Sequence, residues 1–146
     1  MIRQDYILRI IREAVAAIAR MLGATRRGDY IEAQKCADAA YCLLGVPPEL
    51  AIRMDSASLA GLFRQPQKIR MMSQLSWQEG ELFRATGDPI NGLDRQRRAI
   101  ELLLEAQHLD PQPDGSSKLQ QMFRHVPTNC LEERYRGGAL GSAAGD

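Results

Sequence analysis

The sequence is poor in aromatic residues and has no long uncharged apolar run. Aromatic residues make up 5% of its 146 residues, with a single tryptophan, whereas alanine and leucine are abundant. Aromatic and β-branched residues favour strands, and alanine and leucine favour helices, so this composition predicts an all-α fold. No apolar run approaches the roughly 18 residues of a membrane-spanning helix, so we expect no membrane partner.

Cysteines are few, and their spacing matches no disulfide or metal motif. Cys36, Cys42 and Cys130 are odd in number and form no CxxC pair, which argues against a disulfide framework and favours a reducing compartment. We interpret Cys36 and Cys42 as small buried hydrophobic residues. Early charges leave no apolar core for a secretory signal, so we expect a cytoplasmic protein. The arginine-rich first helix leaves a transit peptide or membrane-surface helix as the weaker interpretation, because acids are present early and serine is scarce.

Catalytic and nucleotide-binding motifs are absent from the sequence. It contains no GxxxxGK, GxGxxG, GxSxG or HExxH motif, and its formal net charge of +1 predicts no nucleic-acid partner. We interpret His108, at the end of an expected helix, as structural or solvated. His125 and Cys130 lack a third residue to orient a nucleophile–base pair, and with His108 they match no zinc spacing. We therefore expect no catalytic residue, no cofactor and no metal.

Residues 2–26 are expected to form a long helix with an unusually wide apolar stripe. Ile7, Ile11 and Ile18 recur at helical spacing, and Ile10 and Ala17 widen the stripe beyond the need of one packing partner. Two explanations fit this width. Either the helix is central and touches two neighbours, or Ile10 and Ala17 belong to an interface between two copies of the chain. We favour the second, and expect a homo-oligomer.

Two similar turns divide the chain into helical hairpins. In Gly87-Asp88-Pro89, glycine can adopt the left-handed conformation that ends a helix, aspartate can cap the next helix, and proline suits the first helical position. Gly28-Asp29-Tyr30 repeats this pattern. An apolar segment that begins with alanine follows each turn glycine at the same distance. The sequence therefore predicts two copies of one hairpin.

The second hairpin resembles a tetratricopeptide repeat. The resemblance rests on Gly80, Phe83, the Gly87-Asp88 turn, Ala99 and the closing Leu109-Asp110-Pro111. The sequence departs from the family pattern in several places: Trp77 lies one position late, Gly92 replaces alanine, Gln96 replaces an aromatic residue, and the closing motif comes seven residues late. The resemblance implies stacked antiparallel hairpins and a protein-binding role. The opening Met-Ile-Arg-Gln-Asp-Tyr-Ile-Leu-Arg also resembles the start of a bacterial family with no assigned activity.

The expected architecture is a single helical domain over residues 1–136 with five or six helices. The hairpins span about 2–44 and 67–110, and an inserted helical segment of about 46–66 separates them because the two turns lie farther apart than adjacent repeats. A short helix is possible over about 117–125. Residues 137–146 have the glycine-rich composition of a flexible tail.

The leading functional hypothesis is a small cytoplasmic protein-interaction or scaffold module. Its candidate partner-binding residues are Ile10, Ala17, Trp77 and Arg84. Trp77 is either packed under the inserted segment or the first helix, or is an anchor for a partner. Arginines 95, 97 and 98 alternate with acids, including an Arg97–Glu101 pair, and are interpreted as a solvated, salt-bridged face. The alternative is a helical bundle with a buried ligand or enzyme site, at which His125, Cys130 and these arginines converge.

Overall fold

The computed structural model describes residues 2–137, and within this range every regular element is helical. The predicted all-α class is therefore confirmed. The helices are more numerous than the expected five or six, because the insert and the segment after Pro111 each fold into separate short helices. They are α1 (Ile2–Arg26), α2 (Tyr30–Leu44), α3 (Pro48–Arg53), α4 (Ser56–Phe63), α5 (Pro66–Ala85), α6 (Pro89–Leu109), α7 (Gly115–Phe123) and the 3₁₀-helix η1 (Thr128–Cys130).

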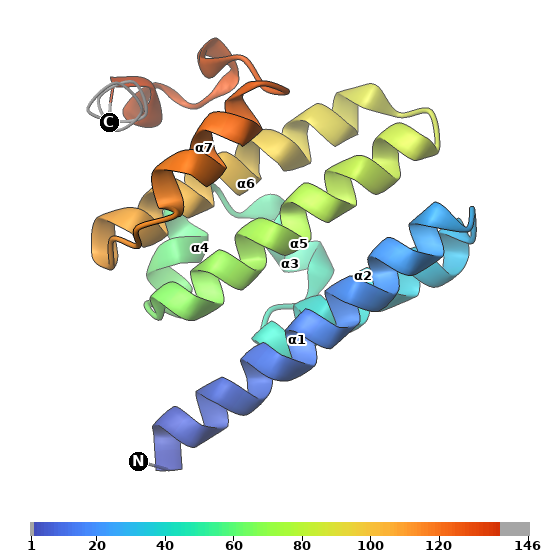
Figure 1. Cartoon of the computed structure of the whole chain (residues 1–146), viewed down its shortest axis with the longest axis horizontal. Coiled ribbons are helices and arrows are strands. Elements are labelled where there is room, and N and C mark those ends of the chain that lie inside the picture. The colour runs from blue at the N-terminus through green and yellow to red at the C-terminus, as the bar shows by residue number, and fades with distance from the viewer. Residues whose placement is uncertain (1, 138–146) are drawn as a thin grey trace.

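Both predicted turns have the expected geometry. Gly28 and Gly87 have left-handed backbones, with φ of 77° and 87°. Asp29 accepts a hydrogen bond from the Glu32 amide at 3.2 Å, and Asp88 accepts one from the Asn91 amide at the same distance. These caps satisfy amides that the first turn of a helix leaves free. The turns fold α1 onto α2 and α5 onto α6, as two hairpins that lie side by side (Figure 1).

The wide stripe of α1 is explained by two neighbours within the chain. α1 packs against both α2 and α5, and its buried residues join a core cluster that includes residues of the first six helices. Ile10 is 8% exposed and Ala17 is fully buried. The central position of α1 between α2 and α5 is therefore sufficient to explain the width of its apolar stripe. Ile10 and Ala17 are core residues of the single chain.

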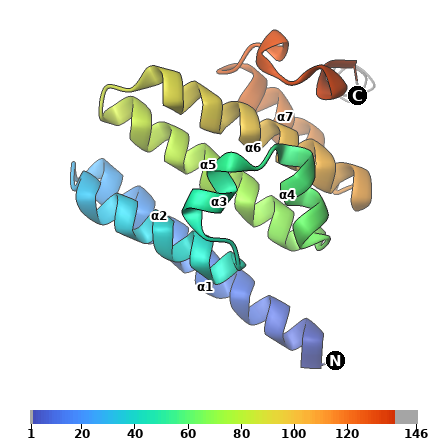
Figure 2. The same cartoon turned by 180° about the vertical axis from the view of Figure 1, so that it is seen from behind.

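The insert covers one side of the two hairpins. Figure 2 shows α3 and α4 on the face opposite to α7, where α3 contacts α2 and α4 contacts α5 and α6. Asp55 caps α4 by accepting a hydrogen bond from the Ser58 amide at 2.7 Å. α4 ends at Phe63, three residues before Pro66, with Arg64 as its C-terminal cap, and Pro66 instead begins α5. Proline at a first helical position loses no hydrogen bond, so its role here is to start a helix rather than to stop one.

The segment after α6 forms a second, smaller core. α7 and the residues after it bury Leu119, Val126, Leu131 and Tyr135 against Ile100 and Leu103 of α6. α7 begins two residues earlier than expected and ends at Phe123. The predicted tail, 137–146, lies outside the described residues except for Gly137.

Candidate functional site

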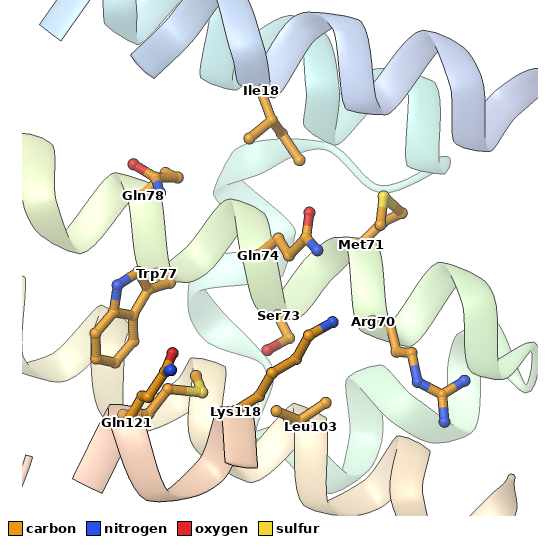
Figure 3. A pocket seen from close by; sticks show the side chains of 11 residues that line it. Ile18, Arg70, Met71, Ser73, Gln74, Trp77, Gln78, Leu103, Lys118 and Gln121 are labelled. Carbon is orange, nitrogen blue, oxygen red and sulfur yellow. The ribbon is translucent and has the colours of Figure 1, made fainter. Parts of the chain in front are cut away.

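A groove opens between α1 and α7, and α5 forms its floor. Its volume is about 320 Å³, within the size range of ligand-binding clefts. Figure 3 shows that α5 contributes most of the side chains, with α1 on one wall and α7 on the other. The groove is lined by Ile18 of α1, Arg70, Met71, Ser73, Gln74, Trp77 and Gln78 of α5, Leu103 of α6, and Lys118, Gln121 and Met122 of α7.

The groove forms because one face of α5 is only partly covered. Met71, Gln74 and Gln78 lie at helical spacing on this face, while the opposite face of α5 packs into the core. Figure 3 shows Met71, Gln74 and Gln78 along the side of α5 that faces Ile18 of α1. Such a surface of thioethers and amides can make both apolar and hydrogen-bonding contacts.

Trp77 forms part of the wall of this groove next to α7. It is half-buried and packs against the C-terminal core, and its ring centroid lies 6.0 Å from that of His125 in an edge-on arrangement. The expectation that Trp77 packs under the insert or the first helix is therefore wrong, because α7 and the loop after it cover that side of α5. Trp77 remains partly accessible in the groove, and its role as an anchor for a partner stays a prediction.

Two cations line the groove, and none of its lining residues is acidic. Arg70 is held by the end of α6: it donates to the main-chain carbonyl of Asp110, and it donates to Oε1 of Gln107 at 3.2 Å. Lys118 pairs with Asp114 at 3.1 Å, and its hydrogen bond and charge lower the pKa of that carboxyl. The Lys118 side chain is half-exposed, so its ammonium group can exchange Asp114 for another anion at little cost.

A buried polar cluster lies on the side of α5 away from the groove. Oε1 of Glu79 accepts hydrogen bonds from the Tyr41 hydroxyl at 2.6 Å and from Nε of Arg95 at 3.0 Å. Burial raises the pKa of Tyr41 well above its ordinary value, and the neighbouring Glu79 charge adds to this effect. The contacts join α2, α5 and α6 through charged groups that have almost no solvent exposure. Such a cluster fixes the arrangement of the two hairpins.

Glu101 is the centre of a second buried set of contacts. It is fully buried, and it accepts hydrogen bonds from the Ser56 hydroxyl at 2.7 Å, from Nη1 of Arg97 at 2.7 Å and from the Glu132 amide at 2.8 Å. The Arg97–Glu101 pair predicted from the sequence is confirmed. Arg97 also pairs with Asp94 at 2.8 Å. Burial opposes the ionisation of Asp94, but the hydrogen bond and the charge of Arg97 have the larger combined effect, so the pKa of Asp94 is lowered.

The interpretation of the arginines as a solvated face is wrong for two of the three. Arg95 and Arg98 are buried, and Arg98 donates to the carbonyls of Ala51, Ile52 and Met54 at the end of α3. Burial lowers the pKa of Arg98. Arg98 pairs with the insert, and Arg95 pairs with Glu79 of α5 as well as with the adjacent Asp94, so helical spacing within α6 gives no sign of the partners on other elements.

The remaining predicted residues lie in separate places. Arg84 is exposed and donates to Gln96 at 2.9 Å, away from the groove. Cys36 is buried as expected, whereas Cys42 is exposed, which corrects its interpretation as a core residue. His125 contacts Trp77, and Cys130 packs against the C-terminal core. Among the described residues, no hydrogen bond or ion pair connects these two side chains to the three arginines.

Comparison of the chain with models of known protein families, with curated proteins and with solved structures finds no match. The function must therefore be inferred from the residues and their geometry. Within residues 2–137, no group of three or more histidine, cysteine and acidic side chains is placed to hold a metal ion. No helix in the same range is long and apolar enough to cross a membrane.

Proposed function

We propose that this protein is a small protein-interaction module that binds a segment of a partner in the groove over α5. The observation that supports this most is the groove itself, which has Trp77 in one wall and a row of methionine and glutamine side chains on its floor. In this row Gln74 is exposed, and Met71 and Gln78 are half-buried. From Arg70 to Gln78 the floor spans about 12 Å, enough for roughly two turns of a helix. The partner segment that fits is an amphipathic helix, with apolar side chains against Met71, Trp77 and Met122.

The resemblance to tetratricopeptide repeats supports the same proposal. Members of that family often bind acidic tails of chaperones through lysine and asparagine on their inner helices. Here the groove is lined mainly by α5, the first helix of its hairpin, with Ile18 of α1 at its edge. Trp77 and Glu81 stand at the positions of the family's acid-binding residues, so we propose a tetratricopeptide-like arrangement with an apolar rather than an acidic recognition mode.

The surface also suits a partner whose exact shape varies. Methionine side chains are flexible and polarizable, and those of Met71 and Met122 can adapt to different apolar contacts. Tryptophan is enriched among the residues that contribute most to binding energy. Gln74 and Gln78 can each donate and accept hydrogen bonds on the floor of the groove. A module of this kind fits the predicted cytoplasmic location and scaffold role, which remain part of the proposal.

Site-specific photo-crosslinking tests this function. A photo-reactive residue placed at Gln74 lies on the groove floor, and the same residue at Lys35 lies on the exposed outer side of α2. In extracts of the source cells, we expect a defined protein to crosslink to the residue at position 74 but not to the residue at position 35. This crosslink should disappear when Trp77→Ala is added. Equal crosslinking at both positions, or no effect of Trp77→Ala in a folded variant, would contradict the proposal.

Homo-oligomerisation is a separate part of the proposal. Ile10 and Ala17 are buried within the chain, so an interface on α1 would use Leu8 and Val15, which lie seven residues apart and are both exposed. The alternative of a buried ligand or enzyme site has less support, since His125, Cys130 and the arginines do not line the groove.

A further inference from the structure

A second pocket lies near the N-terminal end of α5, between the N-terminal half of α1 and the corner that joins α4 to α5. This half of α1 extends beyond the end of α2 (Figure 1), and it contributes Arg3, Tyr6 and Ile7 to the pocket. The corner contributes Arg64 and Lys68. The pocket has a volume of about 610 Å³, and it shares no lining residue with the groove over α5.

The pocket is lined by three cations and by no acid. Arg3, Arg64 and Lys68 come from three different segments, and none of them forms an ion pair with a carboxylate in residues 2–137. The nearest helix start does not supply a carboxylate either. α2, α4 and α6 are capped by aspartates, but Gln65 precedes α5 and its side chain caps nothing. The positive charge of this pocket is therefore not compensated by its own walls.

Arg64 stands at a position where glycine would fold more easily. Its φ of 61° makes it the one non-glycine residue with a positive φ among the described residues, and the comparable left-handed positions are Gly28, Gly45 and Gly87. A side chain makes this backbone conformation less stable than glycine does. Arg64 lines this pocket together with Arg3 and Lys68, and it also lines a neighbouring hollow that contains Glu105.

The rest of the lining is apolar or uncharged. Tyr6 is largely exposed at the mouth, and Ile7 and Phe63 form part of the wall. A ligand that fits such a pocket carries a compact group of at least two negative charges, together with an apolar or aromatic portion. Guanidinium groups match the oxygens of phosphate through paired hydrogen bonds. A phosphate monoester has close to two negative charges at neutral pH, which a carboxylate does not.

From these observations we infer that the pocket binds a phosphate monoester with an apolar or aromatic portion. The phosphate contacts Arg64, Lys68 and Arg3, and the apolar portion contacts Tyr6 and Ile7. A soluble phosphorylated metabolite and the phosphate headgroup of a lipid share this chemistry. The inference does not depend on the groove over α5, so either can fail without the other.

Titration with phenyl phosphate, followed by amide chemical shifts and calorimetry, tests this inference. We expect saturable binding, with shifts centred on Arg64 and Lys68, and weaker binding of inorganic phosphate, which lacks the apolar portion. Vesicles that contain phosphatidic acid, compared with phosphatidylcholine vesicles, identify the source of the phosphate. Binding to phosphatidic acid alone would assign a lipid headgroup, and binding to the soluble ester alone would assign a metabolite.

The critical variant is Arg64→Gly, since it removes one cation and also removes the backbone cost, so it is expected to fold. Arg64→Gly and Lys68→Gln should each weaken binding roughly tenfold, the effect expected for one charged hydrogen-bonding group. Arg20→Gln removes an exposed arginine of α1 outside the pocket and should change binding less than twofold. Absence of binding to both probes, or equal losses in Arg20→Gln and Arg64→Gly, would overturn the inference.

Discussion

Gly80 of α5 and Gly92 of α6 face each other so closely that neither position has room for a methyl group. A Cβ atom on Gly80 would lie 2.8 Å from the carbonyl oxygen of Gly92, and one on Gly92 would lie 2.9 Å from the carbonyl oxygen of Gly80. These distances are shorter than ordinary contacts, so the backbones of the two helices touch at this point. The closeness of α5 and α6 thus depends on a pair of glycines.

Gly80→Ala should separate these helices and lower the free energy of unfolding by about 1–3 kcal/mol, the usual cost of overfilling a packed contact. Gly61→Ala is the matched control. Gly61 lies in α4 with open space around it, and there alanine should stabilise the protein by about 0.4–1 kcal/mol through the unfolded state. Urea unfolding of both variants measures the difference. Similar stability of Gly80→Ala and wild type would show that the helices can shift without cost.

Glu79 and Arg95 should behave as a coupled pair in a double-mutant cycle. Their side chains are buried, and their ion pair is 3.0 Å long. Glu79→Met or Arg95→Met leaves the other charge buried, which should cost about 3–5 kcal/mol, whereas the double variant should cost much less than the sum. Denaturant unfolding provides the three values. Strict additivity would mean that the two charges do not stabilise each other.

The Tyr41 hydroxyl should make a contribution to stability that disappears in alkaline solution. Burial, reinforced by Glu79, raises the pKa of Tyr41 above the ordinary value near 10. A raised pKa in the folded state adds stability that is complete below about pH 10 and is lost as the pH rises further. Tyr41→Phe should therefore cost about 1–3 kcal/mol at pH 8 and less at pH 11. Tyr30→Phe, at an exposed position, should show no such change in thermal unfolding.

Arg98 should control the stability of α3. It donates to carbonyls of Ala51, Ile52 and Met54, which the end of a short helix leaves without partners. Arg98→Met should cost about 1.5–3 kcal/mol and speed amide hydrogen exchange in α3. Arg53→Gln removes an exposed arginine of α3 as a control. Unchanged exchange in α3 would contradict a role for Arg98 in holding it.

Substitutions on α1 should separate core positions from surface positions. Ile10→Glu with Ala17→Glu buries two unpaired carboxylates, so we expect an unfolded chain by circular dichroism. Leu8→Glu with Val15→Glu changes exposed positions and should stay folded. If the proposed homo-oligomer uses the surface around Leu8 and Val15, light scattering will show a monomer for Leu8→Glu with Val15→Glu and a larger species for wild type. A monomeric wild type would remove the oligomer from the proposal.

Local sequence patterns predicted the long helices well. The features that these patterns did not predict depend on contacts between residues far apart in the sequence. Helical spacing and the Gly-Asp turns predicted α1, α2, α5 and α6 to within about two residues, because caps and apolar periodicity are encoded nearby. The burial of Arg95 and Arg98 was missed, because their partners lie on other helices. The groove itself was missed for the same reason, since its walls come from α1 and α7, at opposite ends of the chain.

The three contacts of Glu101 have a consequence for how the molecule comes apart. A single carboxylate holds α4 through Ser56 and the C-terminal segment through the Glu132 amide, although the two segments are far apart in the sequence. Release of either segment leaves a buried charge less well compensated, which makes release of the other easier. The insert and the C-terminal segment should therefore open as one cooperative unit.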